Sequence, residues 1–99
     1  MNVQIRINRF EADSRLIGWV KKRVERLPSY DPGITTVGVY LKVDNPAHQI
    51  KDKVAEIRVH LPHRELLTRH LSKSFQQSFV RAYDSMVESI ARTKGKRFQ

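Results

Sequence analysis

The histidines are the first residues that could do chemistry, because clustered imidazoles are ligands for zinc. His60 and His63 are three residues apart, and His70 follows. There is no cysteine to complete a ligand set, and no carboxylate stands at a matching spacing. His60 lies in a strand-like segment, and a proline turn precedes His63. We expect surface histidines and no metal site.

Acid–base catalysis would need paired ionisable groups. Asp44 with Asp52, or Glu65 with His63, could form such a pair in space, but chance produces such pairs in any highly charged domain. The four glycines are far apart, which excludes a phosphate-binding glycine loop, and there is no nucleophile motif. The sequence therefore predicts no enzyme activity, no cofactor and no small-molecule substrate.

The charge is more informative. The chain of 99 residues carries 19 Lys and Arg against 10 Asp and Glu, a net charge of +9. A small domain this basic is expected to bind a polyanion, most often RNA or DNA, although an anionic membrane or an acidic protein would also fit. No apolar run is long enough for a membrane span, and the N-terminus lacks the apolar block of a signal peptide. With no cysteine, these features favour a cytoplasmic protein.

The cations of the first predicted helix fall on one side. Arg15, Lys22 and Arg26 project within about 40° of one another, opposite the apolar stripe, and span about 16 Å of helix. Arg23 should extend from the edge of the apolar stripe. Lys21 points to the other flank. The alternative is an ordinary solvent-exposed side of the helix. However, Glu25 is the one acidic residue between Ser14 and Leu27, and this excess of positive charge favours a surface that binds phosphates.

The other basic residues are less ordered in the sequence. The solvent side of the second predicted helix mixes Arg81 and Arg92 with Asp84 and Glu88, as an ordinary soluble helix does. Residues 94–99 are basic again and are expected to form a tail. Three aromatic residues could stack on bases, although packing is the commoner role: they are Trp19, Tyr30 and Phe98.

Hydrophobic periodicity predicts the elements that position these residues. A first helix should start within residues 11–14 and stop at Pro28, and a capping box, Ser74 to Gln77, should begin a second helix that ends near residues 93–95. The predicted strands are residues 3–7, 34–43, 53–61 and 64–69.

The order β-α-β-β-β-α predicts an α+β fold, a single two-layer domain with a four-stranded sheet and two helices packed on one face. We expect this domain to occupy residues 1–93. The other face of the sheet would be left open, with Arg6, Tyr40, Lys42 and Arg58 on it.

These patterns resemble one family. Residues 11–27 are similar to the first helix of the ribosome hibernation promoting factors, also called ribosome-associated translation inhibitors. That helix ends in a pattern of cation, apolar residue, any residue, cation and Leu, with an aromatic residue three further on. Here the pattern is Arg23, Val24, Glu25, Arg26, Leu27 and Tyr30. The strand ending Val39-Tyr40-Leu41-Lys42-Val43-Asp44 is similar to the family's second strand. The second helix departs from the family, since Ser85 and Glu88 replace expected cations.

The resemblance implies a partner and a mechanism. The partner is the small ribosomal subunit, whose ribosomal RNA contacts basic residues of both helices. The mechanism is occlusion of the mRNA and tRNA channel, which keeps idle ribosomes inactive during stress or stationary phase. Arg23, Arg26 and Lys42 occupy matching cationic positions; Arg15 and Lys22 rest on the stripe; Arg81 and Arg92 partly substitute for the missing cations. Two alternatives stay open: a double-stranded RNA-binding domain, or a protein-interaction module that uses the open sheet face.

Overall fold

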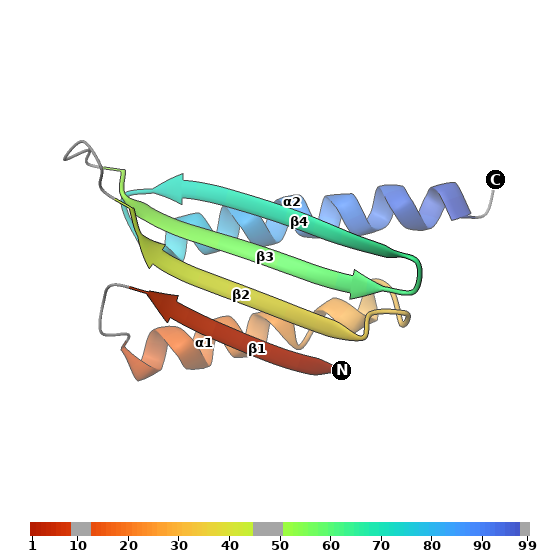
Figure 1. The fold of residues 1–99 in the computed structure, drawn as a ribbon, viewed down its shortest axis with the longest axis horizontal. Coiled ribbons are helices and arrows are strands. Elements are labelled where there is room, and N and C mark those ends of the chain that lie inside the picture. The colour runs from red at the N-terminus through yellow and green to blue at the C-terminus, as the bar shows by residue number, and fades with distance from the viewer. Residues whose placement is uncertain (9–12, 45–50, 98–99) are drawn as a thin grey trace.

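The computed structural model describes residues 1–8, 13–44 and 51–97, and the predicted α+β fold is confirmed (Figure 1). The predicted order β-α-β-β-β-α is observed, with a short 3₁₀ turn at Leu27–Ser29 after the first helix. The strands are β1 (Asn2–Asn8), β2 (Thr36–Val43), β3 (Lys53–Leu61) and β4 (Arg64–Ser72). The helices are α1 (Ser14–Val24) and α2 (Phe75–Arg97). The expected helix-start residues 11 and 12, most of the expected polar loop and Phe98 lie outside the described residues.

The four strands form one sheet in the order β1-β2-β3-β4. β1 runs parallel to β2, because α1 crosses over between them, and the other two pairs are antiparallel. Pro62 and His63 join β3 to β4 as a two-residue turn in which His63 has a φ of 72°. A proline followed by a residue with positive φ is typical of a type II turn. β4 extends to Ser72, three residues beyond its predicted end.

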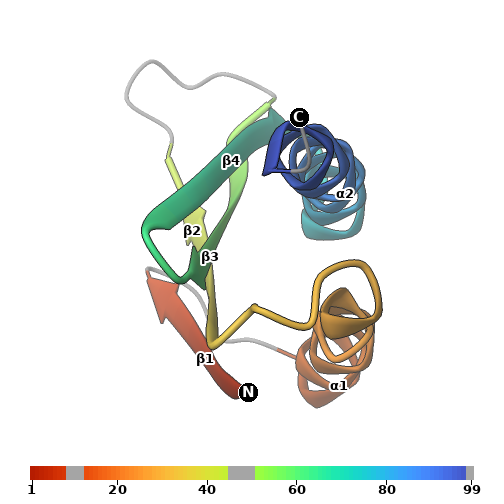
Figure 2. The same ribbon diagram turned by 90° about the vertical axis from the view of Figure 1, so that its right-hand side faces the viewer.

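Both helices cover the same face of the sheet (Figure 2). In that view α1 lies beside β1 and β2, and α2 lies beside β3 and β4. The predicted apolar stripes meet in the core between the layers. Its fully buried side chains include Val20, Val24, Leu27, Val37, Val39, Ile57, Val59, Phe79, Met86 and Ile90. No helix of the described residues covers the opposite face of the sheet (Figures 1 and 2).

The first helix begins and ends by identifiable contacts. The Asp13 carboxylate accepts a hydrogen bond of 2.8 Å from the backbone N–H of Arg15, which caps the first turn. The regular helix stops at Val24, earlier than expected. Pro28 has no N–H to continue it, and Arg26 donates to the Arg23 carbonyl in a tighter turn. Leu27 nevertheless reaches the core, as its place in the apolar stripe predicts.

The second helix has the predicted start and a later end. The Ser74 hydroxyl accepts a hydrogen bond from the backbone N–H of Gln77 at 3.2 Å, which is one half of the capping box. The Gln77 side chain instead accepts a hydrogen bond from the Ser72 hydroxyl. The helix continues to Arg97, so the end expected near residues 93–95 is wrong. A separate role for residues 94–99 as a tail stays a prediction.

Candidate nucleic-acid interface

One flank of α1 faces α2, and the aromatic side chains identify it. The rings of Trp19 and Phe79 meet edge to face with centroids 5.3 Å apart, so Trp19 is a packing residue. The Arg23 guanidinium lies 5.6 Å from the centre of the Trp19 ring on the same flank. This stack keeps Arg23 half-buried, as its position at the edge of the apolar stripe predicted.

The predicted stripe of cations lies beside that flank. Arg15, Lys22 and Arg26 are all exposed, and they form what we call the α1 ridge. At about 100° per residue, Arg15 and Lys22 lie within about 60° of Trp19 around the helix axis, while Lys21 points to the far flank. Arg26 lies in the turn that directly follows α1. The ridge therefore borders the junction between the two helices.

Basic side chains also gather around two tyrosines at this junction. Burial raises the pKa of the Tyr83 phenol above its ordinary value, and nearby Tyr30 raises it further, whereas the positive charges of Arg23 and Arg26 oppose that rise. The Lys94 ammonium donates a hydrogen bond of 3.3 Å to the Tyr30 carbonyl. Arg23, Arg26 and Lys94 form what we call the junction cluster.

Two of these residues were missed in the sequence. Lys94 was assigned to the tail, although it lies eleven residues, or three helical turns, after Tyr83 and so belongs to the same side of α2. Tyr83 was recognised only as part of the apolar stripe. Helical spacing from Tyr83 could have placed Lys94 at the junction, but only if the second helix had been predicted to continue past Thr93.

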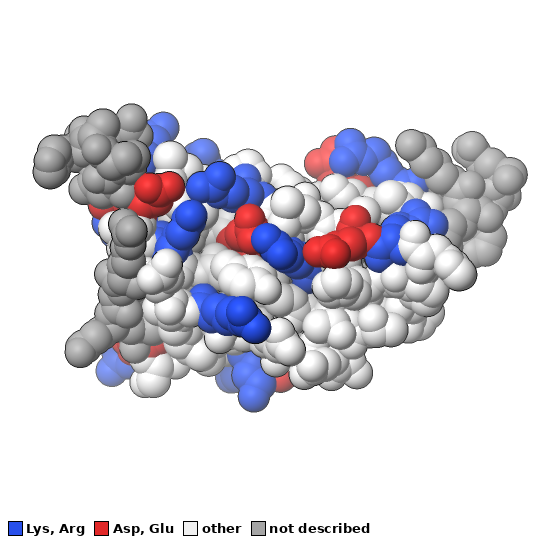
Figure 3. Space-filling view, in the orientation of Figure 1, with Lys and Arg blue, Asp and Glu red and all other residues white. Residues whose placement is uncertain are grey.

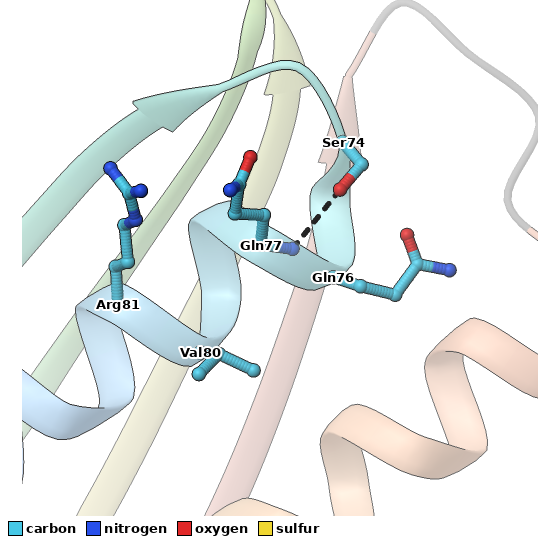
Figure 4. Close-up of a pocket in the computed structure, with 5 residues that line it drawn as sticks. All are labelled: Ser74, Gln76, Gln77, Val80 and Arg81. Atoms are coloured by element: carbon cyan, nitrogen blue, oxygen red, sulfur yellow. Dashed lines mark hydrogen bonds between the residues drawn. The ribbon is translucent and has the colours of Figure 1, made fainter.

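Arg81 and Arg92 do not join the junction cluster. They share one side of α2 with Ser85, whose hydroxyl lies 3.1 Å from His70 Nε2 on β4. They are exposed above the β4 side of the helix, and Arg92 contacts Ser89. In Figure 4, Arg81 and Gln76 extend in opposite directions from the start of α2, with Arg81 on the side away from α1.

Lys42 lies on the opposite side of the molecule. Val39 and Leu41 of β2 are buried beneath the helices, so the intervening Tyr40 and the next residue, Lys42, project from the open face. The expectation that this face gathers Arg6, Tyr40, Lys42 and Arg58 is confirmed by the strand register. The seven predicted RNA-binding residues therefore lie on three surfaces: Arg15, Lys22, Arg23 and Arg26 beside the helix junction, Arg81 and Arg92 above β4, and Lys42 on the open face.

The histidines do not converge. His60 lies on the open face, 3.7 Å from Glu65, while His70 lies under α2. Across residues 1–8, 13–44 and 51–97 no three groups of metal-ligating type come together.

The candidate acid–base side chains have other partners. Asp44 and Asp52 are neighbours, since the Asp44 N–H donates to the Asp52 carbonyl at 2.8 Å, but the Asp44 carboxylate lies 3.7 Å from Arg69 and that of Asp52 contacts Lys53. Glu65 lies 3.7 Å from His60. In the same described ranges no helix is both long and apolar enough to cross a membrane.

Solved structures with the same fold include two bacterial proteins. A ribosomal subunit interface protein from Coxiella burnetii superposes with a TM-score of 0.82 at 14% identity, covering 96% of this chain and 99% of that one. The N-terminal domain of Thermus thermophilus Protein Y gives a TM-score of 0.78 at 26% identity, covering 94% and 99%. A search of curated protein sequences gave no match.

The family resemblance noted in the sequence has independent support. The family model described as sigma 54 modulation protein / S30EA ribosomal protein matches residues 3–97, which is almost the whole chain. The match includes both helices, so the departures in α2 do not remove the chain from the family. This chain therefore belongs to the sigma 54 modulation protein / S30EA ribosomal protein family.

Proposed function

We propose that this protein binds the small ribosomal subunit, occupies the mRNA and tRNA channel, and thereby inhibits translation during stress or stationary phase. The observation that carries the proposal is the family match over residues 3–97, together with the basic residues at the helix junction. The Coxiella relative of the same fold is named a ribosomal subunit interface protein, which fits this partner.

The junction supplies the means of binding. The α1 ridge presents exposed charges, two on the regular helix and Arg26 in the turn that follows it, so they can meet successive phosphates of ribosomal RNA. The Trp19 ring fixes the orientation of Arg23, and Lys94 is held against Tyr30, which reduces the entropy that these side chains lose on binding. Arg81 and Arg92 would contact a second RNA element on the β4 side. No chemical step is required, because a rigid domain inhibits by occupying the channel.

The first test is sedimentation of lysate containing tagged protein through a sucrose gradient at physiological salt. We expect the protein to travel with small subunits and whole ribosomes. The variant Arg23→Gln/Arg26→Gln should remain at the top of the gradient. Lys21→Gln/Lys51→Gln loses the same charge at two exposed sites away from the junction, and should still sediment with ribosomes. Wild-type protein that stays at the top while ribosomes sediment normally would refute the proposal.

A second assay separates occlusion from simple attachment. Added to a cell-free translation reaction, the protein should lower reporter synthesis, and ribosomes preloaded with mRNA and initiator tRNA should resist it. Equal inhibition of free and preloaded ribosomes would contradict occlusion. The proposed role in stationary phase has its own test. The fraction of this protein that is bound to ribosomes should rise when cells enter stationary phase, and a constant fraction would contradict that role.

A further inference from the structure

The open face of the sheet has an organised centre that the helix junction does not use. The register places Arg6 of β1 beside Tyr40 of β2, and Arg58 of β3 beside Gly38. Their side chains project away from both helices, because the alternate residues of each strand form the core. Figure 3 looks onto this face.

The Tyr40 ring is held in place on this face. It lies along the strand over Gly38, where an added Cβ would come within 3.3 Å of the ring. The guanidinium of Arg6 is 5.9 Å from the ring centre, and that of Arg58 is 5.1 Å away. Since β1 and β3 are on opposite sides of β2, the two arginines flank the ring. Because Gly38 has no side chain, the ring can lie close to the strand; a Cβ there would make a tight contact that the ring would have to move slightly to relieve.

The charges around Tyr40 are unbalanced. Glu56 forms an ion pair with Arg58 at 3.1 Å, and Asp44 lies 3.7 Å from Arg69. Within the described part of the chain, Arg6 and Lys42 have no acidic partner. Figure 3 agrees: acidic groups on this face lie next to basic ones, and a basic group over β1 and β2 has no acidic neighbour. The surplus is therefore positive and adjoins the tyrosine.

We propose that the open face binds a single strand of RNA, with one base stacked on Tyr40 and the flanking phosphates held by Arg6 and Lys42. A base can reach Tyr40 only if it is unpaired, because a duplex keeps the faces of its bases stacked on one another. Tyr40 and Lys42 are two residues apart on one strand, about 6.6 Å, so a base and the next phosphate can be held together. This site is on the opposite face from the helix junction, and it goes beyond the proposed ribosome contact.

The exposed leucines of the same face do not favour a protein partner at its centre. Leu67 and Leu71 are 56% and 42% exposed, but both lie on β4, two strands away from Tyr40. Arg58 and Glu56 on β3 separate them from the tyrosine. A second copy covering this face would bring the same surplus of positive charge against Arg6 and Lys42, which is costly.

The test measures binding of the purified protein to a fluorescently labelled ten-nucleotide oligouridine by anisotropy. Tyr40→Ala should weaken binding about tenfold or more, since stacking on an aromatic residue strengthens the binding of each base by that order. Tyr40→Phe should bind within about twofold of wild type, because the ring is retained. Arg6→Gln/Lys42→Gln should make the slope of log affinity against log salt shallower by about 1.4, as expected for the loss of two contacts with single-strand phosphates.

Controls distinguish this site from the ribosome-binding surface. Arg23→Gln/Arg26→Gln lies on the other side of the domain, so Tyr40→Ala should weaken oligouridine binding by the same factor in that variant as in the wild type. Oligouridine binding by that variant without ribosome binding would support two separate surfaces. Unchanged binding by Tyr40→Ala, or equal affinity for a duplex of the same length, would overturn the proposal. So would a dimer in sedimentation velocity that Leu67→Glu dissociates, because a second copy would then occupy the face.

Discussion

Lys21 and Lys22 offer a matched pair for testing whether position or net charge governs ribosome binding. They are neighbours on the last turns of α1, both are exposed, and replacing either with Gln removes one charge. Gln and Lys have similar helix propensity, so neither change should destabilise α1. The two side chains differ by about 100° in direction, and only Lys22 lies on the α1 ridge.

The expected magnitude follows from counterion release. Each phosphate contact contributes about 0.7 to 0.9 to the slope of log affinity against log salt. At about 0.15 M salt, the loss of one contact therefore weakens binding about four- to sixfold. Lys22→Gln should show this loss and a slope shallower by nearly one. Removing all three charges of the α1 ridge, Arg15, Lys22 and Arg26, should weaken binding on the order of 10²-fold.

The assay is equilibrium binding of labelled protein to purified small subunits at several salt concentrations between about 0.05 and 0.3 M. Lys21→Gln should stay within about twofold of wild type at every salt concentration, because its charge lies on the far flank and is screened. If Lys21→Gln and Lys22→Gln reduce the affinity and the slope equally, position does not matter, and the assignment of the α1 ridge as an RNA-binding face is refuted.

Three further predictions concern stability. Asp13→Ala removes the cap on the Arg15 N–H and should lower the free energy of unfolding by about 1 kcal/mol in urea denaturation, whereas Asp13→Asn should retain most of it. Phe79→Ala, in the core beside Trp19, should cost roughly 3–5 kcal/mol, and a loss below about 1 kcal/mol would contradict the packing described. The raised pKa of Tyr83 means that the folded state holds this proton more tightly than the unfolded chain does. The stability gained is complete below about pH 10 and is lost as the pH rises through the folded pKa. Tyr83→Phe should therefore flatten the fall in the free energy of unfolding at alkaline pH. An unchanged pH profile would contradict a raised pKa at Tyr83.

Most of the fold could be predicted because each element has a clear period and a clear boundary. Val37, Val39 and Leu41 alternate as a strand with one buried face requires, and Phe79, Met86 and Ile90 repeat at helical spacing. The end of α2 was not predictable in the same way, since residues 94–97 contain no apolar side chain to extend the stripe and one glycine that disfavours a helix.

The candidate site was predictable only within single elements. Helical geometry predicted that Arg15, Lys22 and Arg26 lie together, because all three fall within the helix expected to end at Pro28. The observed α1 holds only Arg15 and Lys22, and Arg26 lies in the turn that follows it. Helical geometry could not say that this flank faces α2, since that depends on the contact of Trp19 with Phe79 across the layer. Lys42 was grouped with the helix cations through resemblance alone, and its separation from them follows from the alternation of β2.

The most direct test of the central claim is a structure of this protein bound to the small ribosomal subunit by electron cryomicroscopy. We predict the domain in the mRNA and tRNA channel, with the α1 ridge and the junction cluster within hydrogen-bonding distance of ribosomal RNA phosphates. The open sheet face, with Tyr40, should be turned away from those contacts. A domain bound outside the channel, or one whose α1 faces solvent, would contradict the account.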